Sequence, residues 1–236
     1  MRILAFESSA KAASVALLTD GALTGESFLN NGQTHSRTLM KLASDLLENC
    51  ELRPADLDYV AWANGPGSFT GVRIGAAAAK GLCWGLELPA LPVSTLEAMA
   101  WNAADLEGVI CCCMDARRGQ VYNALFRAEG GGLTRLREDR AISLEELEAD
   151  LKGLEGPIHL VGDGALLAWQ SLGDRLDRLH LISEHLRQQR ASGAALAAYA
   201  AALRGEVQNP ASSVPNYLRL SQAERERLAK QSQKGE

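Results

Sequence analysis

The sequence has 236 residues, of which 47% are hydrophobic and 22% are charged, and its formal net charge is -5. This length suits one large domain or two smaller ones, and the composition is ordinary for a globular protein. The negative net charge means that direct RNA binding would require a local basic patch. The apolar run at residues 1–6 is too short for a signal peptide or a membrane span, so we expect a cytoplasmic protein with no membrane partner.

The first strands are predicted at residues 2–6, 14–18 and about 22–29. The turn between the second and third is Asp20-Gly21, a pair that tolerates the positive φ angles of a tight hairpin. The chain therefore opens with an antiparallel meander of three strands.

The first two helices are predicted over residues 35–50 and 70–85, separated by a buried strand at 57–63. In the first helix, leucines recur at helical spacing and form one apolar stripe. The second helix carries mostly small or apolar side chains, so it should be covered nearly all round. Its Gly71 and Gly75 would let another backbone approach closely, which would offset the roughly 1 kcal/mol that each glycine costs relative to alanine.

The second half opens like the first. A strand at 109–114 ends in Asp115, as the first strand ends in Glu7, and return strands follow in both cases. This similarity indicates a weak internal duplication into two lobes. The later elements are helices beginning near Ser94 and Ser143, a strand at 158–161, a helix through Trp169 and an alanine-rich helix at 191–203, followed by a polar tail at 222–234 that is expected to be a frayed surface helix or disordered.

Three of the five cysteines are consecutive, at positions 111–113. Neighbouring side chains on a strand point to opposite faces, so these three cannot easily converge on one metal ion. We expect them to be reduced and to pack as small buried hydrophobic side chains. A redox or metal role is the alternative.

No catalytic or metal-binding pattern is found among the histidines and serines. The four histidines stand at positions 35, 159, 180 and 185, and no two are three or four residues apart, so none pair on one face of a helix. This spacing excludes the histidine pair of zinc proteases. The Gly-x-Ser-x-Gly elbow of serine hydrolases is also missing, because Thr70 stands where Gly65-Pro66-Gly67-Ser68 would need its second glycine.

A nucleotide site is the remaining chemical candidate. Gly162 and Gly164, between a strand and a helix, are placed to approach an adenosine, and the turns after Glu7 and Asp115 are placed to flank phosphates. Short glycine motifs mostly serve as turns, however. We therefore expect no cofactor of the chain's own, and ATP or ADP at most at an interface with another subunit.

One longer motif carries a family resemblance. The run NGPGSFTGVRIG at Asn64–Gly75 is similar to the signature of the TsaB (YeaZ) family. Three other segments, Glu7–Leu17, Asp115–Tyr122 and Pro215–Arg219, resemble further family motifs in the same order. The family's first strand commonly ends in Asp, whereas this sequence has Glu at position 7, which weakens any expectation of a phosphate or metal contact there.

The resemblance implies an α/β, actin-like (ASKHA) fold of two ribonuclease H-like lobes. We divide them into 1–105, with the partner-binding helices, and 106–236, whose last helix would pack back on the first lobe. It further implies a non-catalytic partner of a TsaD-type threonylcarbamoyltransferase, which forms threonylcarbamoyladenosine next to the anticodon of tRNA. A TsaE-type ATPase would join the pair, the tRNA would be the substrate of the complex, and a homodimer would form when the partner is absent.

The partner interface is expected on the two helices of the first lobe. Its predicted residues are Leu39, Leu42, Leu46, Gly71, Arg73, Gly75, Ala76, Ala79 and Lys80. Replacing Gly75 with Leu should then abolish pairing and leave the chain folded. Two alternatives remain: both helices are simply covered by their own sheet, or the chain is an ATP-dependent small-molecule kinase of the same fold, with a catalytic carboxylate between the lobes.

Overall fold

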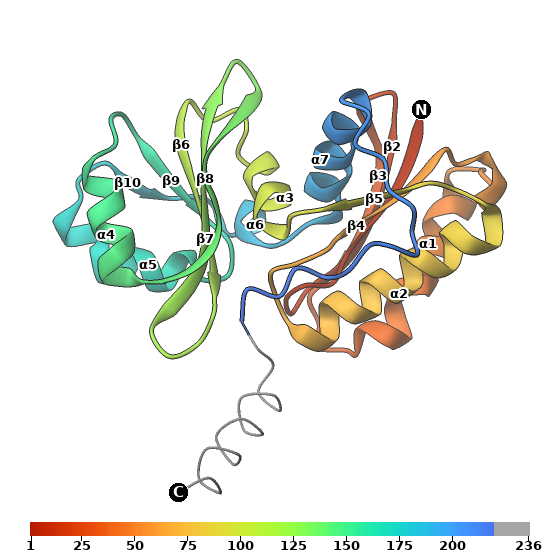
Figure 1. The fold of residues 1–236 in the computed structure, drawn as a ribbon, viewed down its shortest axis with the longest axis horizontal. Coiled ribbons are helices and arrows are strands. Elements are labelled where there is room, and N and C mark those ends of the chain that lie inside the picture. The colour runs from red at the N-terminus through yellow and green to blue at the C-terminus, as the bar shows by residue number, and fades with distance from the viewer. Residues whose placement is uncertain (220–236) are drawn as a thin grey trace, which may run out of the picture.

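The computed structural model describes residues 1–219, and within them the chain forms two lobes, each built on a five-stranded sheet (Figure 1). The first sheet consists of β1 (Arg2–Glu7), β2 (Ala13–Thr19), β3 (Ala22–Leu29), β4 (Tyr59–Ala63) and β5 (Ala90–Val93). The second sheet consists of β6 (Gly108–Asp115), β7 (Gln120–Glu129), β8 (Gly132–Ser143), β9 (Ile158–Val161) and β10 (Leu179–Leu181).

The two sheets share one topology. Their strand orders are β3-β2-β1-β4-β5 and β10-β9-β6-β7-β8, so β1 and β6 are the central strands. In each sheet the central strand pairs antiparallel with the next strand in sequence and parallel with a later one on its other side. This common pattern confirms the duplication that the two strand-and-acid openings predicted.

The helices and short turns are α1 (His35–Asn49), η1 (Pro54–Asp56), α2 (Phe69–Leu86), α3 (Thr95–Trp101), α4 (Leu144–Lys152), α5 (Ala165–Leu172), η2 (Gly173–Arg175), α6 (Glu184–Arg187) and α7 (Ala191–Leu203). The helices predicted from periodicity are all present, with ends within a few residues of the expected ones. The strand predicted at 57–63 begins later, at Tyr59, because the chain first forms the 3-10 turn η1.

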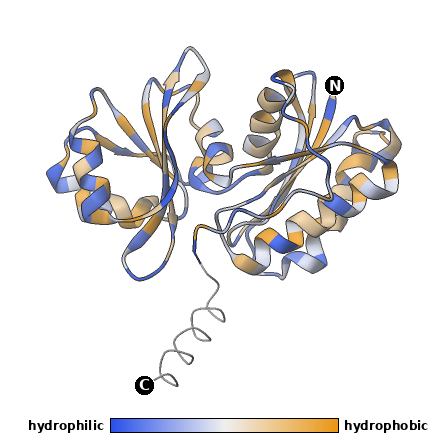
Figure 2. Ribbon diagram, in the orientation of Figure 1, coloured by the Kyte–Doolittle hydropathy of each residue, from blue (hydrophilic) through white to orange (hydrophobic). Residues whose placement is uncertain are grey.

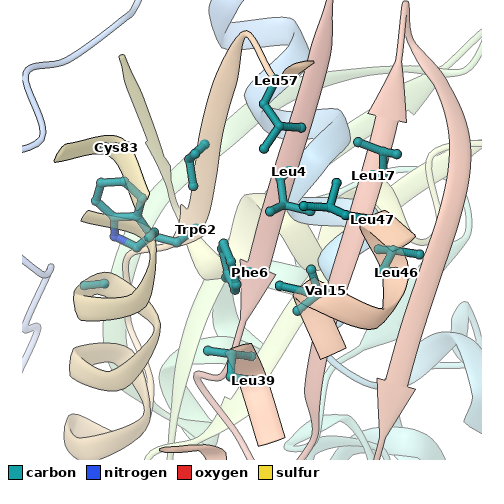
Figure 3. Close-up of a cluster of buried hydrophobic side chains, with 14 of the residues drawn as sticks. Leu4, Phe6, Val15, Leu17, Leu39, Leu46, Leu47, Leu57, Trp62 and Cys83 are labelled. Atoms are coloured by element: carbon teal, nitrogen blue, oxygen red, sulfur yellow. The ribbon is translucent and has the colours of Figure 1, made fainter. Parts of the chain in front are cut away.

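Strands β1, β2, β4 and β5 alternate between two hydrophobic cores, as the period of two for strand side chains requires. On one face, side chains of β1 and β2 meet α1 and α2; Figure 3 shows Leu4, Phe6, Val15 and Leu17 in this cluster. The intervening side chains of both strands face α7 on the other side of the sheet. Figure 2 shows this alanine-rich helix as hydrophobic along its whole length, which fits its position between layers.

Two helices cross the division between the lobes. α7 follows the second lobe in sequence but packs on β1, β2, β4 and β5, whereas α3 precedes that lobe and packs on β6 and β7. The two helices also pack against each other between the sheets, so closely that a Cβ on Gly193 would collide with the Ala98 carbonyl oxygen. The boundary at 105/106 thus separates the sheets but not the helices that cover them.

After α7 the chain returns along the first lobe as an extended segment, residues 206–219, which we call the strap (Figure 1). Gln208 pairs with Ala90 at the edge of β5, and the side-chain amide of Asn64 donates to the Val214 carbonyl oxygen at 2.8 Å. The strap ends on the second lobe. The polar tail predicted at 222–234 lies outside the described residues. Among the helices within residues 1–219, none combines the length and the apolar character needed to cross a bilayer.

Candidate functional site

The inner face of α2 carries the glycines on which the interface prediction centred. A Cβ on Gly71 would collide with the carbonyl oxygen of Ser8, and one on Gly75 would lie 2.5 Å from the Ser8 hydroxyl oxygen. That hydroxyl donates to the Gly71 carbonyl oxygen at 2.9 Å. These glycines therefore admit the chain's own β1–β2 turn, and this packing contradicts the expectation that Gly75→Leu would leave the chain folded. Their contact with a partner stays a prediction. Spacing alone does not show which side of a helix faces its own sheet.

The apolar residues of the predicted interface are also covered by their own lobe. Leu39, Leu46, Ala76 and Ala79 are buried, and Leu42 is half-buried against the same cluster. Figure 3 shows Leu39 and Leu46 pointing toward β1 and β2. The apolar stripe of an amphipathic helix covers its own sheet first, so this packing accounts for these residues without a partner, and their contact with one stays a prediction.

The two cations of the predicted interface hold the strap. The Arg73 guanidinium donates from Nε to the Tyr217 hydroxyl at 2.8 Å and lies over the Phe69 ring, 3.8 Å from its centroid. The Phe69 and Tyr217 rings also pack together, with centroids 4.9 Å apart. The Lys80 ammonium donates to the Ser213 carbonyl oxygen. Both side chains thus bind the chain's own C-terminal segment.

The exposed side of α2 presents a different set of residues, which we call the outer face: Ala77, Gly81, Trp84 and Gly85. They recur at helical spacing on one side of the helix, and the Trp84 side chain is 86% exposed. Among residues 1–219, apart from the adjacent residues and the backbone of α2 itself, no heavy atom lies within 4 Å of a Cβ built on Gly81 or Gly85. These two glycines cost helix stability, roughly 1 kcal/mol each, and the described part of the chain offers no contact that compensates.

Sequence reasoning missed the outer face although its signal was present. Residues 77, 81 and 85 form a second stripe of small residues, out of phase with the stripe at 71, 75 and 79. A helix with two such stripes has a close neighbour on one side and room for another on the opposite side. Within residues 1–219, the structure supplies only the first of these neighbours.

A cleft of about 800 Å³ lies between the lobes, beside the ends of the central strands. The first lobe contributes the turn after β1 and the beginning of α2, and the second contributes the β6–β7 turn, the turn before α5 and part of α6. The end of the strap completes the lining. Its polar and aromatic lining residues include Ser9, Lys11, Phe69, Asp115, Arg117, Tyr122, Asp163, Glu184, Arg187, Tyr217 and Arg219.

The predicted nucleotide residues lie in or near this cleft. Asp115 and Gly162 line it, whereas Glu7 is fully buried beneath it and Gly164 packs under β6. A Cβ on Gly162 would collide with the Cys113 carbonyl oxygen, and one on Gly164 would lie 2.7 Å from the Met114 carbonyl carbon. Packing against β6 therefore explains both glycines without a nucleotide.

Glu7 is an enclosed carboxyl group. Its Oε1 accepts a hydrogen bond from the Ser9 backbone N–H at 2.5 Å, and Oε2 has no partner among the described residues. Burial raises the pKa of Glu7 to about 7, and the nearby Asp163 carboxylate adds to the shift. Desolvation in the cleft wall also raises the pKa of Asp163.

Two further sequence predictions concern cysteine and histidine. Cys111, Cys112 and Cys113 are fully buried in β6, as predicted. The parallel register of β9 and β10 places His159 beside His180, with ring centroids 5.7 Å apart, a pairing that a search at helical spacing could not detect. In the described part of the chain, no group of three or more His, Cys, Asp or Glu side chains is arranged to hold a metal ion.

Comparison with solved structures defines the fold class of this chain. The P. aeruginosa structure described as an uncharacterized protein with similarity to peptidase YEAZ superposes with a TM-score of 0.76 and 26% identity, covering 92% of this chain and 99% of that one. Component A of (R)-2-hydroxyglutaryl-CoA dehydratase from Acidaminococcus fermentans shares the fold alone, at a TM-score of 0.50 and 14% identity over 86% of this chain and 99% of that one. The fold is therefore that of the actin-like ATPases, with two ribonuclease H-like lobes.

Sequence comparison is more specific. The family model described as TsaD, tRNA N6-adenosine threonylcarbamoyltransferase, matches residues 30–226. A Bacillus subtilis relative named tRNA threonylcarbamoyladenosine biosynthesis protein TsaB is 34% identical over 225 residues, which is 95% of this chain and 96% of the relative. The chain belongs to the TsaB (YeaZ) family, as its motifs indicated.

Proposed function

We propose that this chain is the non-catalytic partner of a TsaD-type threonylcarbamoyltransferase and supports the formation of threonylcarbamoyladenosine next to the anticodon of tRNA. The names of its relatives support the pathway. The observation that supports the partner role is the outer face of α2, where an exposed tryptophan stands beside two helix glycines that no described residue approaches. The complex would include a TsaE-type ATPase, act on tRNA, and work in the cytoplasm.

The outer face suits a helix of a homologous subunit. The TsaD family model matches residues 30–226, a range that includes α1 and α2, so a TsaD-type partner is expected to have equivalent helices. Glycines on facing helices allow the backbones to approach, and Trp84 supplies apolar area. Burying a tryptophan side chain of about 150–250 Å² contributes on the order of 4 kcal/mol before the costs of association. The same face would pair with a second copy of this chain when the partner is absent.

Three observations support a non-catalytic role. The cleft carboxyl of Glu7 is enclosed and its pKa is raised to about 7, while Asp115 forms an ion pair with Arg117 at 3.3 Å. The glycines proposed for adenosine binding are required by packing on β6. A small-molecule kinase would need a free carboxylate in this position, so the geometry favours the partner role. Under the proposal the chain has no cofactor of its own, and ATP or ADP would belong to the complex.

Size-exclusion chromatography with light scattering tests the proposal directly. The purified chain mixed with a TsaD-type subunit should elute as a one-to-one complex. Gly81→Arg should leave the circular dichroism spectrum unchanged and abolish the complex, because the new side chain fills the space reserved for a partner helix. The matched control is Gly132→Arg, an exposed glycine in β8 of the second lobe, which should still pair. A Gly81→Arg chain that binds as tightly as the original rules out the outer face as the interface.

A further inference from the structure

The interlobe cleft collects positive charge from four segments that are far apart in sequence. Among the described residues, Lys11 comes from the β1–β2 turn, Arg117 from the β6–β7 turn, Arg187 from α6 and Arg219 from the strap, and all four line the cleft. Acidic residues line it too, at positions 115, 163 and 184, and Asp115 is paired with Arg117. The four cations outnumber the three carboxylates, so in a chain whose formal net charge is -5 the cleft lining has a small local excess of positive charge, which favours RNA binding.

The β6–β7 turn holds its arginines in a strained backbone. Arg117 and Arg118 have φ angles of 65° and 58°, and Gly119 follows at 70°. A left-handed conformation costs an ordinary L-residue about 1–2 kcal/mol, so Asn and Gly are the usual choices in such hairpin turns. Packing does not explain the arginines, because both are exposed and the Arg117 side chain is 82% exposed. Strain of this kind is typical of functional sites.

Donors without partners face the same region. The Nε atom of Arg187 is buried and has no hydrogen-bond partner within residues 1–219, and the same is true of the Ser9 hydroxyl. The beginning of the 18-residue helix α2 also lines the cleft, at Ser68 and Phe69. The amino end of a helix attracts anions through its free N–H groups and dipole.

Aromatic rings accompany these cations. Phe69, Tyr122 and Tyr217 line the cleft from three different segments. Cationic grooves interleaved with aromatic rings are typical of surfaces that bind unpaired nucleotides, in which phosphates meet the cations and bases stack on the rings. The ligand chemistry that this combination fits is a phosphodiester chain with accessible bases.

We propose that the cleft rim, defined as the lining cations Lys11, Arg117, Arg187 and Arg219 together with Arg118, the neighbour of Arg117 in the same turn, binds the phosphate backbone of the RNA on which the complex acts. The inference rests on the proposed function and adds an RNA-contacting surface to this subunit. The rim adjoins the amino end of α2, whereas the outer face occupies residues 77–85 in its carboxyl half. One subunit can therefore hold its protein partner and the RNA at the same time.

The strained turn allows a variant that loses charge without losing stability. In the double variant Arg117→Asn, Arg118→Gly, the left-handed positions receive the residues that prefer them. We expect its thermal midpoint to equal or exceed that of the original chain. The affinity of its complex with the TsaD-type subunit for fluorescent tRNA should fall about tenfold or more, and the slope of log affinity against log salt should decrease by about two.

The matched control removes two arginines that do not line the cleft. Arg53 and Arg204 are exposed and pair with Asp56 and Glu206. The variant Arg53→Gln, Arg204→Gln changes the net charge equally and should bind tRNA with the original affinity and salt slope. A non-hydrolysable ATP analogue is titrated in parallel with both variants.

Each outcome separates the two proposals. If the Asn-Gly variant keeps the original tRNA affinity and salt slope, the cleft rim does not bind RNA and the inference is overturned. The inference is also overturned if the variant loses nucleotide binding while its tRNA binding stays intact. An equal loss in the control also overturns it, because the effect then follows net charge. If no complex forms with the TsaD-type subunit, the proposed function fails; the rim is then tested on the chain alone with an anticodon stem-loop RNA, against the same criteria.

Discussion

The two faces of α2 contain the same residue type for opposite reasons. On the inner face, Gly71 and Gly75 admit Ser8 of the chain's own β1–β2 turn. On the outer face, Gly81 and Gly85 have open space around them in the described structure, beside the exposed Trp84. A glycine in a helix thus indicates close approach by something, and only the fold shows whether that neighbour belongs to the same chain.

The largest effect on the stability of the chain is expected at the inner face of α2. Gly71→Ala places a methyl group against the Ser8 carbonyl oxygen, a backbone atom that cannot move aside without shifting the turn. We expect a loss of about 3 kcal/mol or more in the free energy of unfolding, at the upper end of overpacking effects. Urea denaturation of the lone chain measures it, with Gly81→Ala as the matched substitution. Equal midpoints for the two variants contradict the assignment of the inner face.

The next effect concerns Glu7, which precedes the serine that the inner glycines contact. Its pKa rises from 4.5 to about 7 on folding, so the folded state binds the proton more tightly. The stability from this proton is fully present below the unfolded pKa and is lost as pH rises through the folded value, by about 3 kcal/mol in total. Glu7→Gln should remove this dependence and be the more stable chain above about pH 8. Urea denaturation of both chains at acidic and at alkaline pH measures this difference. If the Glu7→Gln chain shows the same pH dependence of stability as the original, the assignment of Glu7 as an enclosed carboxyl is contradicted.

A smaller effect on binding is expected at the outer face. Trp84→Ala should weaken pairing with the TsaD-type subunit roughly thirtyfold, since buried tryptophans are frequent hot spots of interfaces. The stability of the lone chain should change by less than about 0.5 kcal/mol, because the side chain is exposed there. Isothermal titration calorimetry measures the affinity. Trp169→Ala is the control, because this tryptophan is also partly exposed, at 43%, but lies on α5 of the second lobe. Similar losses in both variants argue against a specific outer face.

The smallest effect on stability is expected when a glycine of the outer face is replaced by alanine. Gly81→Ala or Gly85→Ala should stabilise the lone chain by up to about 1 kcal/mol, through helix propensity alone. The same methyl groups should weaken pairing if a partner backbone approaches them. Thermal unfolding of the lone chain and titration of the pair measure the two quantities. If a variant gains stability and keeps its affinity for the TsaD-type subunit, the partner backbone approaches α2 most closely at another position of the outer face.

Local sequence patterns accounted for most of the secondary structure. Alternating and helical hydrophobic periods identified the strands around Phe6 and Val15 and the helices α1 and α2. The three-residue strand β10 and the four-residue helix α6 were not predicted, because β10 has only two apolar residues and α6 is about one turn long. The four-residue strand β9 was predicted because it is a mostly apolar run that ends just before Gly162. The helix α7 was also predicted, and its packing on β1, β2, β4 and β5 fits the expectation that the last helix packs back on the first lobe. That expectation came from the family resemblance, because a helix that is apolar all round does not itself indicate which surfaces it contacts.

The sequence by itself determined the family, through the glycine-rich run at Asn64–Gly75, and the order of strands and helices along the chain. The tertiary structure alone decided which stripe of α2 faces inward and that cations at positions 11, 117, 187 and 219 line one cleft. The reason is physical. Periodicity relates residues within one element, whereas contacts such as that of Ser8 with Gly71, 63 positions apart, depend on how distant elements pack together.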